Sequence, residues 1–171
     1  MPVGKGQPFA SQLPHWANAL IGGWELGAIQ TLQTGAPFTV SSGIATIANT
    51  SRANFSGDRN IGEVRRTGNG VYYFTPAEMA AFSYPVAGDG GNSGRNAFHG
   101  PALWDVDMSL VKRFRVAERQ AVAFRWEAYN ALNRTGFAAP ATVLSNTATF
   151  GKIGSLAVNP RQMQLALRYD F

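Results

Sequence analysis

The chain of 171 residues contains no cysteine. It therefore has no disulfide and no thiolate metal site, although a periplasmic or cell-surface protein need not use disulfides. Its two histidines, His15 and His99, have neither a His-x-x-x-His partner nor a cysteine at the spacing of a local zinc site. We expect neither a metal nor another cofactor.

Long hydrophobic runs are also missing. No stretch approaches 18 consecutive apolar residues, which excludes a transmembrane helix. Residues 1–8 lack the apolar centre of a signal peptide, so we expect the start of an exported protein to lie further upstream. Helical signals are restricted to residues 13–21 and 76–82, and the remainder has the pattern of strands and loops.

Acidic residues are outnumbered: 10 Asp and Glu stand against 15 Lys and Arg, and the net charge is +5. A basic stripe with interleaved aromatics would indicate nucleic-acid binding. The densest basic cluster, residues 112–115, instead lies at the end of an alternating segment. This position favours a strand end at a membrane or solvent boundary, and we expect no nucleic-acid partner.

The strongest positive feature is alternation at the end of the chain. Over residues 161–171 the apolar positions share one strand face and the polar positions share the other; the apolar ones are Met163, Leu165, Leu167, Tyr169 and Phe171. A tilted strand needs about 9 to 11 residues to cross a bilayer. An apolar outer face and a polar inner face are typical of a transmembrane barrel, whereas a soluble sheet needs a second layer over its apolar face.

Three further segments alternate in the same way: residues 24–33, 104–114 and 122–132. Ile29 and Gln30 break the rule in the first, and Val111 and Lys112 break it in the second. The pattern predicts an all-β protein, specifically an antiparallel transmembrane β-barrel segment of about four full strands plus part of a fifth.

The connections between these segments differ greatly in length. Residues 117–120 fit a tight hairpin, whereas residues 41–101 and 133–160 are long and rich in Gly, Asn, Ser and Thr. Outer-membrane barrels have short periplasmic turns and long outer loops, so we predict two extracellular loops and a periplasmic chain end. This orientation places aromatic girdles near both boundaries: Trp24, Phe114, Tyr169 and Phe171 at the periplasmic one, Trp104 and Phe38 at the outer one.

The charges also predict the register of the hairpin. Placing Arg113 opposite Arg125 would set like charges against each other. A shift of two residues sets Ser109 opposite Glu127 and Val111 opposite Arg125, and we favour this second register.

Residues 22–39, 94–110 and 124–133, followed by the terminal strand from Pro160, form blocks in a characteristic order and spacing. In these blocks the chain resembles the C-terminal end of TonB-dependent outer-membrane receptors, of the Oar-like type that contains a carboxypeptidase-regulatory-like domain. The resemblance implies that residues 1–171 are the C-terminal segment of an outer-membrane β-barrel domain in a Gram-negative bacterium. It also implies a barrel of about 22 strands with a plug.

The partners implied by this resemblance are outer-membrane lipid, the rest of the barrel and its plug, the TonB system acting through that plug, and the barrel assembly machinery. Tyr169 and Phe171 would form the C-terminal aromatic signal that the assembly machinery recognises. A four-stranded open sheet leaves two unpaired edges, which lipid does not tolerate. We therefore expect a fragment of a longer protein that is not active alone and contributes to uptake of an unknown ligand.

Catalytic patterns are weak, and we expect no enzyme. There is no Gly-x-Ser-x-Gly elbow. The glycine-rich run at residues 88–95 lacks the Lys-Ser/Thr of a phosphate-binding loop and precedes a strand, which favours a flexible turn. Asp105 and Asp107 share a face and could act as an acid pair. A lumen charge network with Arg113, Arg125 and Glu127 is the favoured interpretation.

Candidate ligand contacts lie in the first long loop, at Tyr72 and Tyr73, because loops on rigid scaffolds carry binding and aromatics dominate recognition. The alternative is a short strand at residues 71–74 that packs on Phe82. Two other functions remain open: a soluble β-sandwich module that binds a ligand or carbohydrate, and a secreted enzyme fragment that uses the two aspartates.

Overall fold

The computed structural model describes residue 17, residues 21–47 and residues 49–171. These residues form two compact units that alternate along the chain. The strand unit contains the described residues up to Thr31 together with Asp105–Arg134 and Asn159–Phe171, and the loop unit contains the described residues of Leu32–Trp104 together with Thr135–Val158.

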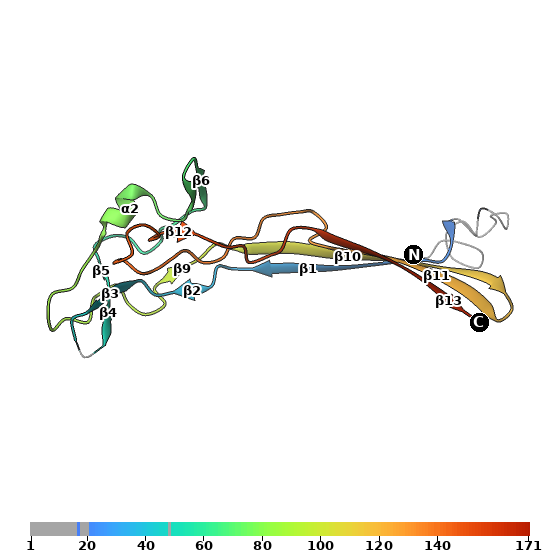
Figure 1. Cartoon of the computed structure of the whole chain (residues 1–171), viewed down its shortest axis with the longest axis horizontal. Coiled ribbons are helices and arrows are strands. Elements are labelled where there is room, and N and C mark those ends of the chain that lie inside the picture. Colours follow the sequence, from blue (N-terminus) through green and yellow to red (C-terminus); the bar gives the residue numbers. More distant parts are fainter. Residues whose placement is uncertain (1–16, 18–20, 48) are drawn as a thin grey trace. The chain divides into compact units, whose positions relative to one another are not determined.

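A four-stranded sheet dominates the strand unit. Its order is β1 (Trp24–Gln33), β10 (Leu103–Ala117), β11 (Gln120–Tyr129) and β13 (Gln162–Asp170), as Figure 1 shows. The four predicted strands and the all-β antiparallel class are confirmed. Within the described residues no strand pairs with the outer edge of β1 or of β13, so the sheet is open.

Two strand ends differ from the prediction. β10 continues through the basic cluster to Ala117, so this cluster lies within the strand and not at its end. β11 stops at Tyr129, three residues before the expected end, because Asn130 adopts a positive φ of 48° and leaves the ladder. The Asn130 amide then donates to the carbonyls of Arg134 and Asn159, which fixes the chain where it leaves the sheet.

The hairpin between β10 and β11 has the predicted short turn and the favoured register. Ala117 pairs with Gln120, which leaves a two-residue turn. Ser109 lies opposite Glu127, and Val111 lies opposite Arg125. Arg113 lies opposite Ala123, so the two arginines are not set against each other.

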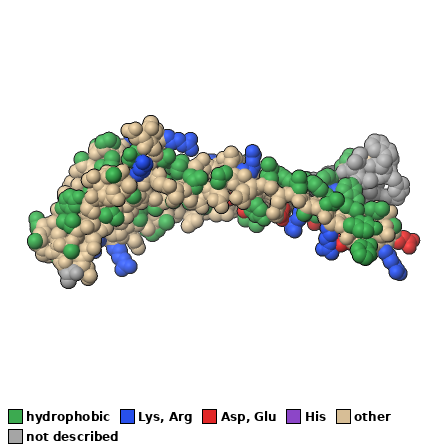
Figure 2. Space-filling model, in the orientation of Figure 1, with side chains coloured by type: hydrophobic (Ala, Val, Ile, Leu, Met, Phe, Trp, Pro, Cys, Tyr) green, Lys and Arg blue, Asp and Glu red, His purple; other side chains and the backbone are tan. Residues whose placement is uncertain are grey.

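One face of the sheet is apolar in successive cross-strand rows, among them Leu110–Trp126–Leu165 and Phe114–Val122–Tyr169. Leu165 and Leu167 are 70% and 75% exposed, so no second layer of described residues covers them. Hydrophobic side chains gather along these strands in Figure 2. An uncovered apolar face contradicts the requirement of a β-sandwich, and that alternative is not favoured.

The loop unit is built from short strands and one helix. Three strands form one sheet, in the order β12 (Lys152–Ile153), β7 (Gly70–Tyr72) and β6 (Arg65–Thr67). The other strands pair in twos: β2 (Pro37–Phe38) with β9 (Phe98–His99), β3 (Ser41–Ala45) with β4 (Thr50–Arg52), and β5 (Asn54–Phe55) with β8 (Phe82–Ser83).

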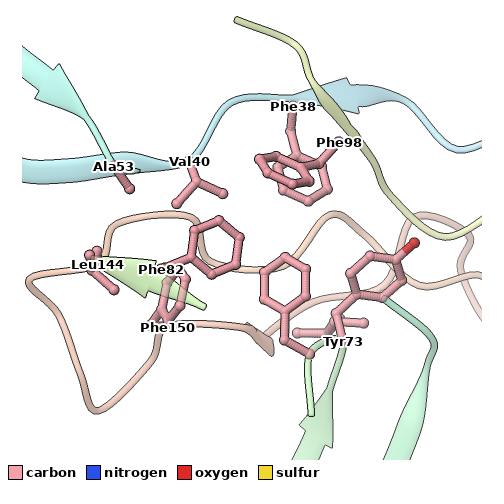
Figure 3. Close-up of a cluster of buried hydrophobic side chains, with 10 residues drawn as sticks. Phe38, Val40, Ala53, Tyr73, Phe82, Phe98, Leu144 and Phe150 are labelled. Carbon is pink, nitrogen blue, oxygen red and sulfur yellow. The ribbon is translucent and has the colours of Figure 1, made fainter. Parts of the chain in front are cut away.

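The two long connections share one aromatic core (Figure 3), whose residues are Phe38, Val40, Ala53, Tyr73, Phe74, Phe82, Phe98, Leu144, Phe150 and Ile153. Phe82 of the first connection meets Phe150 of the second with ring centroids 5.4 Å apart. Backbone bonds join them as well: the Tyr73 N–H donates to the Gly151 carbonyl at 2.7 Å. Burial of such rings is a large hydrophobic gain, so the two connections fold as one unit.

Helix α2 (Pro76–Ala80) confirms the second helical signal, although it is shorter than residues 76–82. Thr75 is the N-cap, Pro76 occupies the first turn, and Ala81 caps the end because Phe82 joins β8. The first helical signal, residues 13–21, falls largely outside the described residues, as does His15. No helix among the described residues has the length and apolarity to span a membrane.

Candidate functional site

The polar face of the four-stranded sheet holds a hollow of about 400 Å³. It lies over Gly27, Asp107, Ser109, Arg125 and Glu127. A β-carbon at Gly27 would stand 2.7 Å from the Ser109 hydroxyl oxygen, so a larger residue there would fill part of this space. Ile29, one of the residues that break the alternation of β1, also lines the hollow.

The charges in this hollow form a smaller network than the sequence predicts. Arg125 Nε lies 3.0 Å from a Glu127 carboxylate oxygen, and the Gln164 amide donates to the same carboxylate. Asp107 instead accepts the Asn130 N–H at 2.9 Å, and Asp105 accepts the N–H of the adjacent Val106. Asp107 lines the hollow with Arg125 and Glu127, but among the described residues no ion pair joins Asp105 or Asp107 to Arg113 or Arg125, so the wider charge network stays a prediction.

Lys112 is the unexpected residue of the apolar face. Its side chain is 2% exposed, and its ammonium donates to the carbonyl of Gly22. The ammonium also lies 5.3 Å from the Trp24 ring centroid and 5.1 Å from that of Phe114. A hydrogen bond together with two cation–π contacts compensates a buried cation, which explains how the apolar face contains a lysine.

The predicted aromatic girdle is assembled at one end of the sheet. Phe114, Val122 and Tyr169 form one cross-strand row, and the Tyr169 and Phe171 rings stack with centroids 6.0 Å apart. Trp24 lies at the same end of the sheet, since the Lys112 ammonium contacts both the Trp24 ring and the Phe114 ring. Phe38 was wrongly placed in the opposite girdle: it is 9% exposed within the aromatic core, because its ring packs on Phe98. A role of Tyr169 and Phe171 in assembly stays a prediction.

Tyr72 and Tyr73 have different environments. Tyr73 is 6% exposed, and its hydroxyl donates to the His99 carbonyl at 2.8 Å. Burial, and to a smaller extent the negative charge of Glu78, raises the pKa of the Tyr73 hydroxyl. Tyr72, the end of β7, is half-buried. Strand β7 and the 5.5 Å distance between the Phe74 and Phe82 ring centroids agree with the alternative of a short strand that packs on Phe82. Ligand contact stays a prediction, and of the two tyrosines Tyr72 is the one available for it.

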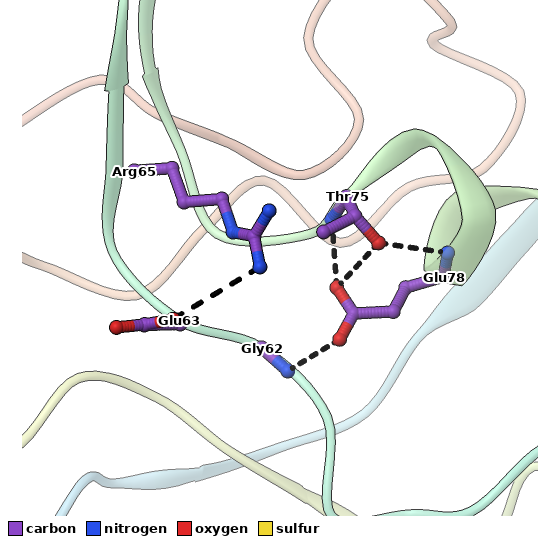
Figure 4. A network of polar contacts seen from close by, with 5 residues as sticks. All are labelled: Gly62, Glu63, Arg65, Thr75 and Glu78. Carbon is purple, nitrogen blue, oxygen red and sulfur yellow. Dashed lines mark hydrogen bonds and ion pairs between the residues drawn. The ribbon is translucent and has the colours of Figure 1, made fainter.

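A polar network fastens α2 to the segment before β6 (Figure 4). The Glu78 carboxylate accepts the Thr75 N–H at 2.7 Å, the Thr75 hydroxyl at 3.0 Å and the Gly62 N–H at 3.3 Å. Burial alone would raise the pKa of Glu78. These hydrogen bonds, with the positive charge of Arg65, outweigh burial and hold that pKa below its usual value.

The glycine-rich run at residues 88–95 is a braced turn. Gly91 has a φ of +81°, and a β-carbon there would stand 2.1 Å from the Arg52 carbonyl oxygen. Asn92 accepts the Phe55 N–H at 2.7 Å, and the next regular element is β9, which is a strand. The turn interpretation is therefore correct, although these contacts hold the run closely against β4 and β5.

A family model described as outer membrane beta barrel domain matches residues 1–164. The chain belongs to this outer-membrane β-barrel family. Comparison with curated proteins and with solved structures found no match. Membership of the family, together with the exposed apolar side chains of β13, supports a role in a barrel wall at the outer membrane.

Two features of this barrel segment were missed from the sequence. The Thr75–Glu78 network carries a recognisable signal, since Thr-x-x-Glu at a helix start is a capping box, but its bond to Gly62 depends on the fold. Lys112 appeared as an exception to the alternation. Nothing local to Lys112 indicates that its ammonium reaches Gly22.

Proposed function

We propose that the chain forms part of the barrel wall and the outer loops of a TonB-dependent outer-membrane receptor that takes up a ligand. The observation that carries this proposal is the apolar face of β10, β11 and β13, which is exposed along β13 and whose reverse face is polar. Such a sheet suits lipid on one side and a polar lumen on the other. The Oar-like blocks at residues 22–39, 94–110 and 124–133 favour the TonB-dependent type.

In this proposal the wall performs no reaction of its own. Lipid contacts the apolar face, while the rest of the barrel pairs with the outer edges of β1 and β13, since unpaired backbone groups are costly in lipid. The plug faces the polar hollow and connects to the TonB system, and the barrel assembly machinery inserts the product. Nucleic acid is not a partner, and the location is the outer membrane of a Gram-negative bacterium.

The wall itself is tested by cysteine accessibility, because the chain has no native cysteine. Single cysteines replace Met108 and Leu165 on the apolar face, and Ser109 and Gln164 on the polar face of the same strands. In native outer membranes, a lipid-soluble maleimide should label the first pair, and a water-soluble one should favour the second. Equal aqueous labelling of all four positions would contradict a membrane wall.

The transport role needs a separate test. In cells that produce the whole receptor, in-cell cross-linking should capture TonB on that receptor, and uptake through it should stop when TonB is deleted. A receptor that remains fully active without TonB would refute the TonB-dependent type and leave the barrel wall intact.

A further inference from the structure

The three-stranded sheet of the loop unit places two cations on either side of a tyrosine. In the β12–β7–β6 ladder, Lys152 lies opposite Tyr72, and Tyr72 lies opposite Arg65. Directly opposite residues of an antiparallel pair project from the same face of the sheet. Lys152, Tyr72 and Arg65 therefore form one row on one face, which we call the cationic row.

The cationic row faces away from the aromatic core. The neighbouring row, Ile153, Val71 and Arg66, projects from the other face. Ile153 is 6% exposed in the core, Val71 packs against that core, and the Arg66 guanidinium lies 5.5 Å from the Phe137 ring centroid. Because one face is committed to packing, the face with the cationic row is the one open to a ligand.

A glycine lets the lysine of the row reach across the sheet. Gly70 shares the face of Tyr72, and a β-carbon at Gly70 would stand 2.9 Å from Lys152 Cε and 3.5 Å from Lys152 Nζ. The lysine therefore lies over the middle strand β7. Gly70 lies opposite Thr67 of β6, two residues along the same face from the Tyr72–Arg65 pair, so the ammonium lies over β7 beside that pair.

The polar groups of the cationic row keep binding capacity. No hydrogen bond or ion pair joins the Lys152 ammonium to any part of the chain that the structure describes. Arg65 meets Glu63 at 3.9 Å, but the Glu63 side chain is 80% exposed, and such a surface pair is weak. The nearby Glu78 carboxylate is occupied by Thr75 and Gly62.

The backbone that carries the cationic row is fixed before any ligand arrives. The Lys152 carbonyl accepts the Ala141 N–H at 2.9 Å, and the Tyr73 carbonyl accepts the Glu63 N–H at 2.9 Å. The first bond holds β12 to the segment at Ala141, and the second extends the pairing of β6 with β7 beyond the two strands. Preorganised donors lose less entropy on binding, which favours a recognition site over a set of independent surface charges.

We propose that Arg65, Tyr72 and Lys152 bind the anionic group, a carboxylate or a phosphate, of a ring-containing small molecule. The guanidinium and the ammonium bracket the anion with charge-assisted hydrogen bonds, and the Tyr72 ring contacts the ring of the ligand. As a statement about transport, this inference rests on the proposed receptor function, because it names the ligand class that the loop unit selects.

Binding is measured by calorimetry on the whole receptor in lipid nanodiscs, with three probes: trigalacturonate for carboxylate, glucose 6-phosphate for phosphate, and neutral galactotriose. At least one anionic probe should bind more tightly than galactotriose, and its affinity should fall as salt rises. The double variant Arg65→Gln/Lys152→Gln should weaken that binding about tenfold or more, since two charge-assisted bonds are lost.

Matched variants distinguish binding by the cationic row from a general effect of positive charge on the loop unit. Arg95→Gln removes an exposed cation of the loop unit outside the row and should leave affinity within about twofold. Lys152→Arg keeps the charge and should retain binding, whereas Tyr72→Ala should weaken it and Tyr72→Phe should not. Hydrogen exchange of the loop unit should match the parent receptor in every variant, which excludes unfolding as the cause.

Three results would overturn the cationic row as an anion site: equal affinity for galactotriose, no effect of the double variant, or no binding of either anionic probe. None of these outcomes would contradict the receptor function, which cross-linking to TonB tests separately. Conversely, binding that depends on the row in a receptor that never engages TonB would refute the transport role alone.

Discussion

Ser109 lies directly opposite Glu127 across the β10–β11 hairpin, and this pairing sets the register of the sheet. It leaves Val111 opposite Arg125 and allows Glu127 to bind both Arg125 and Gln164 on the polar face. A shift by one residue would turn every apolar side chain towards the lumen, whereas a shift by two would keep the faces but oppose Arg113 and Arg125.

We predict that Ser109→Cys combined with Glu127→Cys forms a disulfide in the folded barrel. Opposed residues have Cα atoms about 4.5–5.5 Å apart, within the range of a disulfide. The control is Ser109→Cys with Tyr129→Cys, the pair that the register with opposed arginines would join. Oxidation followed by non-reducing gel electrophoresis measures both, and faster closure of the control pair would show that the register is different.

We predict that Tyr73→Phe weakens the loop unit by about 1 kcal/mol, because the His99 carbonyl loses its donor. Tyr73→Ala should cost about 3–5 kcal/mol, since it also opens a cavity among the aromatic rings. Hydrogen exchange of the loop unit measures the free energy of local opening. An unchanged exchange rate in Tyr73→Ala would contradict the packed aromatic core.

The raised pKa of Tyr73 also predicts alkaline sensitivity. Its hydroxyl stays protonated in the folded unit to a higher pH than in the unfolded chain, whose tyrosine pKa is 10.0. The contribution to stability is therefore full below that value and is lost as pH rises through the folded pKa. Hydrogen exchange after correction for the intrinsic pH dependence should show this loss in the parent chain but not in Tyr73→Phe.

The lowered pKa of Glu78 predicts that the loop unit loses stability at acid pH. Its folded pKa lies below the unfolded value of 4.5, so its contribution is present above that value and is lost as pH falls through the folded pKa. Glu78→Gln should make opening of α2 and Gly62 nearly independent of pH in this acid range. Loss of the cap in Thr75→Ala should cost about 0.5–2 kcal/mol at neutral pH. An identical acid response in Glu78→Gln and the parent chain would assign that response to another group.

We predict that deletion of Phe171 from the parent receptor reduces its insertion into the outer membrane. The stacked Tyr169 and Phe171 rings are exposed at the girdle end of the sheet, where a recognition signal would be accessible. Surface labelling of cells, normalised to total receptor, measures insertion, and Met163→Ala on the same strand is the control. Normal surface levels after the deletion would show that assembly does not use this signal.

The strand unit was largely predictable because its information is local. A period of two assigns each side chain to a face, and the lengths of the connections assign the order of strands. Both rules hold for β10, β11 and β13. The end of β11 was misjudged because Leu132 continues the apolar pattern, while the strand is ended by the backbone of Asn130.

By itself, the sequence determined an open amphipathic sheet, its hairpin register and the outer-membrane β-barrel family, since alternation, charge and turn length act between neighbouring residues. The tertiary structure alone decided that both long connections form one aromatic core, that Tyr73 faces it, and that Arg65 and Lys152 flank Tyr72. Lys152 and Tyr72 are distant in the chain and become neighbours only because burial of the shared aromatic rings brings β12 beside β7. No local pattern records that pairing.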